Sequence, residues 1–520
     1  MTSAPGLRAL MLYALVLPLA LLLGYMLATP TDFSTLAAVG LVLGVVSMPL
    51  VLKWYYESML LSWHMAAVVF FLPGAPELWL VLAFISFAVV MAQRALSQEM
   101  TFISVPSLTW PLLFIFVVVL VTARLTGGIG LRALGGSTFG GRGYIWITGG
   151  VLGFFVMISR HIRQERARLC AGLFLLGGFT SIITTLMAFG PAGLFNLALL
   201  FPVGGAELEK IADELGFMTG FGSSIARFSG LTIACQAVFC FMLARYGIRQ
   251  MLTGTGFWRF VVLVGVAMVG SLGGFRSTFI LLALTFLLLF YYEGLVRSKY
   301  FAIFLGLLML AGVTLVPFAN KLPLSIQRAI SVLPFNVDPI ARFEAEASTE
   351  WRLRMWEMLL PEVPHYLWVG KGLAVSGASM EFSGDLMRRG QTSSQETAIL
   401  TGTYHNGPLT VIIPFGIWGA IGWLWFLIAS IRALYLNHRY GAGYLQHINT
   451  FLLAYFVANT IVFLTIYGDF RSQFAPFVGI VGLSVALNGG IRRQERTVAA
   501  KAADLETQLD VVPNVPMPAR

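Results

Sequence analysis

Repeated long apolar stretches constrain the fold of this chain more than any other feature. A helix needs about 20 mainly apolar residues to cross a bilayer. Fourteen stretches approach that length: 9–28, 35–52, 58–73, 77–93, 108–123, 144–159, 169–188, 226–244, 257–272, 277–292, 300–318, 408–430, 447–467 and 474–489. Two neighbouring pairs, 58–73/77–93 and 257–272/277–292, have short members and tight connections. The sequence therefore predicts an all-α, polytopic membrane bundle of 12 to 14 transmembrane helices.

The composition supports a membrane protein and excludes several other classes. Hydrophobic residues make up 58% of the chain and charged residues only 11%, whereas soluble domains carry about 25% charged residues. A soluble enzyme, a secreted disulfide scaffold and a disordered protein are therefore excluded. The three cysteines all lie in apolar segments, so they indicate neither a disulfide framework nor a metal site. We expect the first stretch to be an uncleaved transmembrane helix, because it is long enough to span and further spans follow.

The distribution of basic residues predicts the orientation. The net charge of +10 does not indicate nucleic acid, since most Lys and Arg residues lie between apolar runs. If the N-terminus is cytoplasmic, Lys and Arg are in excess in the loops on that side, and acidic residues are in excess on the other. One inner loop alone carries Arg160, Arg163, Arg166 and Arg168. Cytoplasmic loops are the Lys/Arg-rich ones, so both termini are predicted to be cytoplasmic.

This orientation divides the chain into four parts. Residues 1–318 hold transmembrane helices 1–11, 319–407 form one large outward loop, 408–490 hold the C-terminal helices, and 491–520 form a disordered cytoplasmic tail. The outward loop 189–225 contains an amphipathic stretch, Ala206 to Phe217, that we expect to form a helix at the membrane interface. Only the 319–407 loop has the size and polarity of a soluble segment that could build a site.

One histidine is the candidate general base. Of the six histidines, only His365 and His405 are predicted to face outward. His405 stands where the large loop joins the next apolar helix, so it could reach both a lipid-linked group and an acceptor. Histidine titrates near neutral pH and is suited to deprotonating a hydroxyl. The alternative is that His405 is an interfacial residue at the start of a helix.

Several outward arginines form the second candidate feature. Arg276 lies between two apolar segments in Gly273-Gly274-Phe275-Arg276-Ser277-Thr278, Arg227 opens a span, and Arg352 and Arg354 lie in the large loop. A charge at membrane depth costs several kcal/mol unless it snorkels or is paired. Guanidinium groups bind phosphate oxygens bidentately, so a converging set would suit a pyrophosphate. Alternatively, each arginine snorkels or forms an ion pair with an acid of the large loop. Those acids are Glu344, Glu346, Glu350 and Glu357.

Known motifs for metal or nucleotide chemistry are missing from the sequence. There is no zinc-protease helix, phosphate-binding loop or nucleophile elbow. Asp32 is the only acid of the first outward loop, so the paired-acid metal site of many lipid-linked glycosyltransferases is missing. We therefore predict neither a metal nor a cofactor. Gly370-Lys371-Gly372 is interpreted as a turn. The aromatic residues of the large loop could stack on sugars or anchor the loop at the interface.

The candidate residues occur in a recognisable order. The motifs are Arg227-x-x-Gly230, Gly-Phe-Arg276-Ser, Arg352-x-x-x-Trp356, Gly370-x-Gly372, His405-Asn406 and Gly416. In the order of these motifs, and in the side of the membrane that they are predicted to face, the chain resembles the O-antigen ligase and O-antigen polymerase superfamily of bacterial envelope glycosyltransferases. The resemblance covers residues 227 to 422. Each motif is short, and their combination carries the resemblance.

The resemblance implies an inverting, metal-independent glycosyltransferase with a GT-C-like helical bundle and no cofactor. Its donor would be a glycan on undecaprenyl pyrophosphate at the periplasmic face of the inner membrane, with a lipid or glycan acceptor. Arg276 and Arg352 would hold the pyrophosphate, Arg227 is a weaker match, and Arg354 is a neighbour. His405 would activate the acceptor hydroxyl. The possible supporting residues are Asn406, Trp356 and Gly416.

The chain departs from the family pattern at some positions, and several functions remain open. Ile280 stands where the family often has Leu, and Phe275 precedes Arg276 where the family has Ser. The choice of Arg352 over Arg354 depends on the spacing to Trp356. Ligation to lipid A core, polymerisation of repeat units and protein glycosylation share the same donor chemistry. A transporter or lipid-glycan flippase is the alternative from another class, although such proteins place ionisable residues near the midplane. A non-catalytic assembly scaffold is the remaining alternative.

Overall fold

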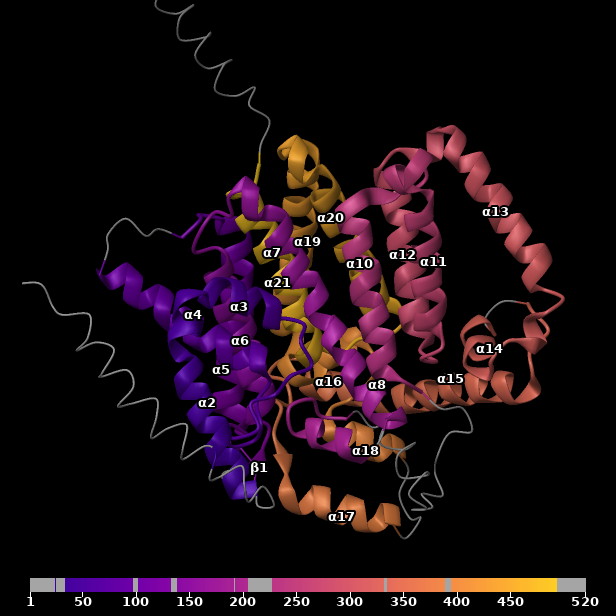
Figure 1. Ribbon diagram of the computed structural model, residues 1–520. Coiled ribbons are helices and arrows are strands. Elements are labelled where there is room, and N and C mark those ends of the chain that lie inside the picture. Colours follow the sequence, from indigo (N-terminus) through magenta and orange to yellow (C-terminus); the bar gives the residue numbers. More distant parts are fainter. Residues whose placement is uncertain are drawn as a thin grey trace, which may run out of the picture.

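The computed structural model describes residues 24, 33–96, 102–131, 138–190, 192–203, 227–331, 334–388 and 394–492. These residues form helices almost throughout (Figure 1). Two short strands, β1 (Thr138–Phe139) and β2 (Val375–Ser376), pair antiparallel. The all-α fold is therefore confirmed. Three predicted segments lie outside the described residues: nearly all of the first span (9–28), the interfacial helix at 206–217, and the tail beyond residue 492.

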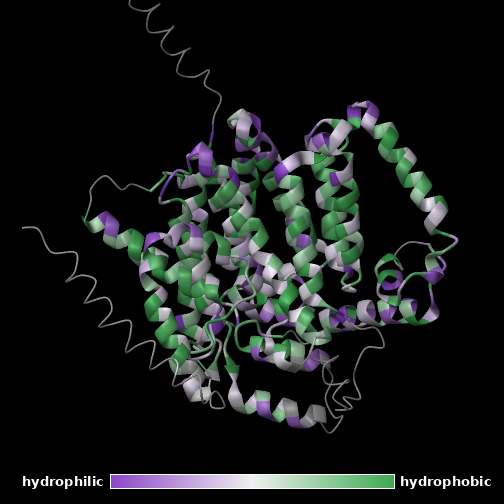
Figure 2. Cartoon of the chain, in the orientation of Figure 1, coloured by the Kyte–Doolittle hydropathy of each residue, from purple (hydrophilic) through white to green (hydrophobic). Residues whose placement is uncertain are grey.

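Within the part of the chain that the structure describes, eight helical segments are long and apolar enough to cross a membrane, so this is a multi-pass membrane protein. They are Leu78–Leu96 (α4), Pro106–Thr126 (α5), Gln164–Phe189 (α7, η2 and α8), Ser229–Met251 (α10), Gly254–Ser271 (η4 and α11), Gly407–Tyr440 (α19), Gly443–Thr465 (η8 and α20) and Phe470–Asn488 (α21). The bent pair α2 (Phe33–Lys53) and α3 (Tyr55–Ser62) could make a ninth. Figure 2 shows hydrophobic residues along the helices and hydrophilic ones toward their ends.

Other apolar helices of the described chain are shorter than a full span. They are α6 (Gly141–Met157), α12 (Arg276–Tyr292) and α13 (Lys299–Leu315). The predicted span 58–73 is wrong as a continuous helix, because α3 ends at Ser62 and α4 begins only at Leu78. The intervening chain contains Pro73-Gly74-Ala75-Pro76, in which Gly74 and Ala75 have positive φ. Prolines and left-handed residues do not continue a helix.

The last three helices pack into the most buried part of the bundle. Their large side chains, including Phe426, Phe456 and Phe477, are fully buried. Two buried amides, Asn449 and Asn488, exchange hydrogen bonds between α20 and α21 at 3.0 and 2.8 Å. Because a buried amide without a partner is costly in an apolar interior, this reciprocal pair fixes the register of the two helices.

The segment predicted as a large outward loop is mostly helical. It contains α14 (Leu324–Ile330), α15 (Pro339–Leu359), α16 (Val363–Tyr366), α17 (Gly377–Arg388) and α18 (Ser394–Thr401), which gather at one end of the bundle in Figure 1. At the start of α15 the Asp338 carboxylate accepts a hydrogen bond from the Ile340 amide at 2.8 Å, and Pro339 occupies the first turn. Both features favour a helix start at this position.

A kink in α19 joins this region to the bundle. Gly416 has a φ of +64°, which interrupts the helix. Backbone groups of the preceding segment replace the lost helical bonds. The Gly372 amide donates to the Pro414 carbonyl at 2.9 Å, and the Ile417 amide donates to the Leu367 carbonyl at 2.6 Å. Gly370 and Gly372 also have positive φ, but the 370–372 segment runs along α19 instead of closing the predicted turn, with the Lys371 amide donating to the Ile413 carbonyl at 2.8 Å.

We expect Gly416→Ala to destabilise the protein. An alanine at this position would have to adopt the left-handed backbone conformation, and its Cβ would lie 2.8 Å from the Leu367 carbonyl oxygen. Such strain costs about 1–3 kcal/mol, so the temperature at which the detergent-solubilised protein unfolds should fall. Gly306→Ala is the control, because Gly306 lies inside α13 and nothing approaches its Cβ position. Equal stability of both variants would contradict a structural requirement for glycine at 416.

Candidate functional site

Four of the predicted residues line one cavity of about 300 Å³. Arg227 precedes α10, Arg276 opens α12, Arg352 lies on α15, and His405 immediately precedes the Asn406 cap of α19. The other lining residues are Ser229, Thr232, Ile233, Gly274, Phe275, Ser277, Thr278, Arg328, Ser348 and Tyr467. Residues from α10, α12, α14, α15 and the ends of α19 and α20 therefore meet at one point.

A close turn between α11 and α12 places Arg276. Gly273 packs so tightly on Thr232 that a Cβ there would collide with the threonine hydroxyl. Gly274 then takes a positive φ of +76° before α12 begins. Glycine is required where the backbone approaches this closely or turns left-handed. From this position the Arg276 Nη2 donates to the Ala345 carbonyl at 3.0 Å and to Thr349 Oγ1 at 3.3 Å, which ties α12 to α15.

Arg328 is a cavity residue that sequence reasoning missed. Its side chain is only 4% exposed, and its Nη1 donates to the Gly274 carbonyl at 3.2 Å. Its Nε lies 3.8 Å from Glu344 Oε2, and Arg227 Nη2 lies 3.9 Å from the same oxygen. Among the described residues, neither Arg227 Nε nor Arg328 Nε has a hydrogen-bond partner. Nothing in the sequence around Arg328 separates it from an ordinary surface arginine such as Arg342.

The cavity carries an excess of positive charge. Four guanidinium groups (those of Arg227, Arg276, Arg328 and Arg352) line it, and the carboxylate of Glu344 forms ion pairs with two of them. Burial lowers the pKa of Arg328 to about 10, and the positive charge of Arg227 acts in the same direction. Burial is also the main reason that the pKa of Arg352 is lowered. An anion entering this space would relieve both desolvation and the repulsion between cations.

His405 is held in an unusual backbone conformation. Its φ is +50°, one of two positive values among the described residues other than glycine. On one side the Trp356 Nε1 donates to the Tyr404 carbonyl at 3.0 Å, and on the other the Asn406 side chain accepts from the Leu409 amide at 3.1 Å. These two contacts fix the chain before and after the histidine. A strained residue that its neighbours hold in place is typical of functional sites.

The imidazole of His405 is partly buried between two aromatic rings, in surroundings that disfavour its charged form. Its ring centroid lies 5.4 Å from that of Trp351 and 5.3 Å from that of Tyr467. Nδ1 is buried and has no hydrogen-bond partner among the described residues. Burial lowers the pKa of His405 below its usual value near 6.5, Arg352 lowers it further, and Asp469 opposes both. A neutral imidazole with an unused nitrogen can accept a proton.

The remaining predicted residues lie around the cavity or away from it. Arg354 does not line it, because its side chain is 65% exposed and forms an ion pair with Glu350. Of the two predicted arginines on α15, only Arg352 therefore faces the site. Trp356 and Asn406 support the backbone beside His405, and Gly416 forms the α19 kink. Tyr467, between α20 and α21, is a second lining residue that was not predicted.

Comparison with known families gives one match. Residues 257–424 match the family model described as O-Antigen ligase. This range contains Arg276, Arg328, Arg352 and His405, whereas Arg227 and Tyr467 lie outside it. No curated protein matches the chain. Among the residues that the structure describes, no group of three or more His, Cys, Asp or Glu side chains could hold a metal ion.

Proposed function

We propose, from the match of residues 257–424 to the O-antigen ligase family model, that the protein transfers a glycan from a polyprenyl pyrophosphate to an acceptor hydroxyl. The reaction would take place at the periplasmic face of the bacterial inner membrane, with both termini in the cytoplasm. One observation carries the proposal: four arginines and one histidine line the same cavity, and the surroundings of the histidine lower its pKa. The arginines suit the donor pyrophosphate, and the histidine suits the acceptor hydroxyl.

The arginines provide the donor site in this proposal. A pyrophosphate ester is a compact polyanion, and guanidinium forks match its oxygens in geometry and charge. Arg276 and Arg352 would make the principal contacts, with Arg227 and Arg328 supplying further positive charge. The undecaprenyl chain implied by the family resemblance would remain in the bilayer. The excess of cations over the single carboxylate of Glu344 supports an anionic ligand.

His405 acts as general base in the proposed reaction. The acceptor oxygen attacks the anomeric carbon of the donor sugar, and its proton passes to the imidazole. The bond between that carbon and the pyrophosphate oxygen breaks, and the electron pair leaves with the pyrophosphate. Fixed cations lower the barrier where negative charge develops, so the arginines would stabilise the leaving group without a divalent metal. Attack opposite the leaving group inverts the anomeric configuration.

Reconstitution tests this function and its alternatives. The full chain in vesicles would receive a polyprenyl-pyrophosphate glycan, either with lipid A core or with a second donor molecule as the only acceptor. A ligase, which is the function proposed first, transfers the glycan to lipid A core. A polymerase instead produces a ladder of lipid-linked glycans. Movement of the donor across the membrane without a covalent product would overturn the proposal in favour of a flippase.

The pH profile of transfer should report the environment of His405. Because burial and Arg352 lower its pKa, the acid limb of the activity profile should lie at a lower pH than the usual pKa of a histidine would give. Asp469 raises this pKa, so Asp469→Asn should lower it further. The acid limb of kcat/KM should therefore move to lower pH in the variant. A limb that moves to higher pH, or that does not move, would contradict this assignment.

A further inference from the structure

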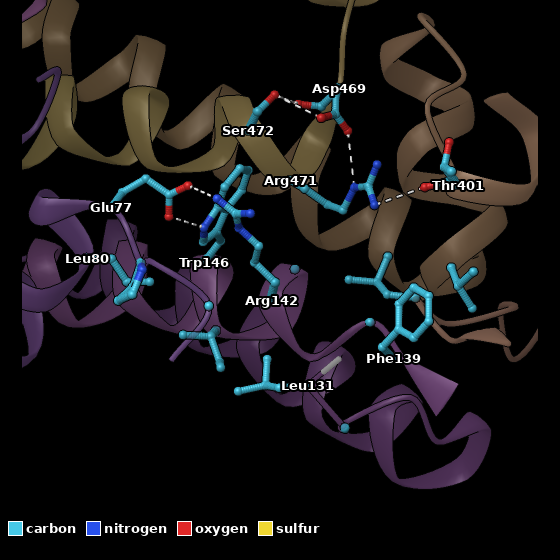
Figure 3. A pocket seen from close by; sticks show the side chains of 18 of the residues that line it. Glu77, Leu80, Leu131, Phe139, Arg142, Trp146, Thr401, Asp469, Arg471 and Ser472 are labelled. Atoms are coloured by element: carbon cyan, nitrogen blue, oxygen red, sulfur yellow. Dashed lines mark hydrogen bonds and ion pairs between the residues drawn. The ribbon is translucent and has the colours of Figure 1, made fainter. Parts of the chain in front are cut away.

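Figure 3 shows a second and larger cavity, of about 960 Å³. It lies close to the cavity lined by Arg227, Arg276, Arg328 and Arg352, which we call the arginine cavity. The walls of the larger cavity come from the loop before α4, residues 130–131, the start of α6, the start of α21, and Leu373, Val375, Met380 and Thr401. Only the last four of these residues lie in the region matched by the family model. The mechanism proposed above makes no use of this space, which we call the second cavity.

Two chain segments separate the two cavities. In the first segment Thr401 lines the second cavity and His405 lines the arginine cavity. In the other segment Asp469 lines the second cavity and Tyr467 lines the arginine cavity. The Tyr467 ring contacts the His405 ring, and the Asp469 carboxylate acts electrostatically on the imidazole. The proposed base therefore belongs to the wall that the cavities share.

The charges of the second cavity are balanced, unlike those of the arginine cavity. Glu77 accepts hydrogen bonds from Arg142 and from Trp146 Nε1, the latter at 2.8 Å. Arg471 Nε lies 3.5 Å from Asp469 Oδ1, and Arg471 Nη1 donates to the Thr401 carbonyl at 3.2 Å. Figure 3 shows these two groups on opposite sides of the space. Each cation has its own carboxylate, so no excess positive charge remains for a pyrophosphate.

The walls combine an aromatic ring, paired polar groups and apolar side chains. The guanidinium of Arg142 lies over the Trp146 ring, 5.2 Å from its centroid. The apolar lining includes Leu80, Leu131, Phe139 and Leu373. Saccharides offer hydroxyl groups to ordered carboxylate and guanidinium pairs, and their C–H faces pack on aromatic and apolar walls. A neutral sugar matches this set better than an anion does.

We propose that the second cavity binds the terminal saccharide of the acceptor, with Trp146, Arg142 and Glu77 as binding residues. This inference rests on the proposed function. An inverting displacement needs the attacking hydroxyl and the departing pyrophosphate on opposite sides of the anomeric carbon. Two cavities on either side of the 401–405 and 467–469 segments, one lined by His405 and the other by Asp469, would provide this arrangement, with the donor pyrophosphate among the arginines and the acceptor sugar in the second cavity.

Substitution of Trp146 tests the assignment by kinetics. In Trp146→Ala the KM for the acceptor should rise about tenfold or more, because a stacking face and a hydrogen bond to Glu77 are lost. The affinity for a polyprenyl-pyrophosphate glycan, measured without acceptor, should stay unchanged. Trp146→Phe keeps a ring and should have a smaller effect. Trp258→Ala removes an exposed tryptophan of α11 and serves as the matched control.

A binding measurement without donor separates this inference from the proposed function. The probes are the delipidated lipid A core oligosaccharide and the free donor glycan, each titrated onto the full chain in nanodiscs. Binding of either probe to the wild type, weakened by Trp146→Ala and kept by Trp258→Ala, supports the second cavity even if transfer is never observed. The inference would be overturned if neither probe bound, or if both bound equally to all variants. It would also be overturned if Trp146→Ala lost affinity for the intact polyprenyl-pyrophosphate glycan.

Discussion

Replacing His405 should lower glycan transfer by about 10²–10⁴-fold, which is the usual contribution of a general base. His405→Asn is a sharper variant than alanine, because asparagine tolerates the left-handed backbone that this residue adopts at a φ of +50°. The fold should therefore survive while the base is lost. Turnover should fall with little change in affinity for the donor, since the arginines remain in place.

A second outward histidine provides the control for this variant. His365 is exposed near the end of α16 and does not line the arginine cavity. His365→Asn should therefore retain wild-type transfer. If a correctly folded His405→Asn protein transferred glycan at the wild-type rate, the imidazole would have no part in the reaction. Equal losses in the two variants would also count against His405 as the base.

The sequence allowed much of the cavity to be predicted. In the predicted topology, Arg227, Arg276, Arg352 and His405 stand at the outward ends of apolar helices or in the segment between them. Membrane topology restricts such residues to one face, so a pattern of spans and charges is enough to bring them near one another. The choice between Arg352 and Arg354 needed coordinates, because two residues two positions apart on α15 point in different directions.

Other features depended on packing that no local pattern encodes. Arg328 enters the cavity because α14 packs beside α15 and the α11–α12 turn, so that its guanidinium reaches the Gly274 carbonyl. The second cavity unites segments as distant as Glu77 and Arg471. The predicted span 58–73 was wrong because α3 ends at Ser62 and the backbone beyond it bonds to other segments, with the Val68 amide donating to the Leu200 carbonyl and the Val69 amide to the Pro76 carbonyl.

The second large effect is expected from a matched pair of arginines on α15. Arg352→Lys should reduce kcat/KM by about 10- to 100-fold, whereas Arg354→Lys should leave it close to wild type. Arg352 lines the cavity, while Arg354 is exposed and paired with Glu350. Hydrogen bonds to charged groups contribute about 1.5–3 kcal/mol each, and lysine cannot reproduce the planar fork of arginine.

A third variant separates the contribution of the planar guanidinium group of Arg352 from that of its positive charge. In Arg352→Gln the charge is removed as well, so transfer should fall further than in Arg352→Lys, and donor affinity should fall with it. If lysine restored full activity, a point charge would be sufficient and the bidentate contact would be wrong. If Arg354→Lys caused the larger loss, the functional arginine of α15 would be the exposed one, and the donor would bind outside the cavity that contains His405.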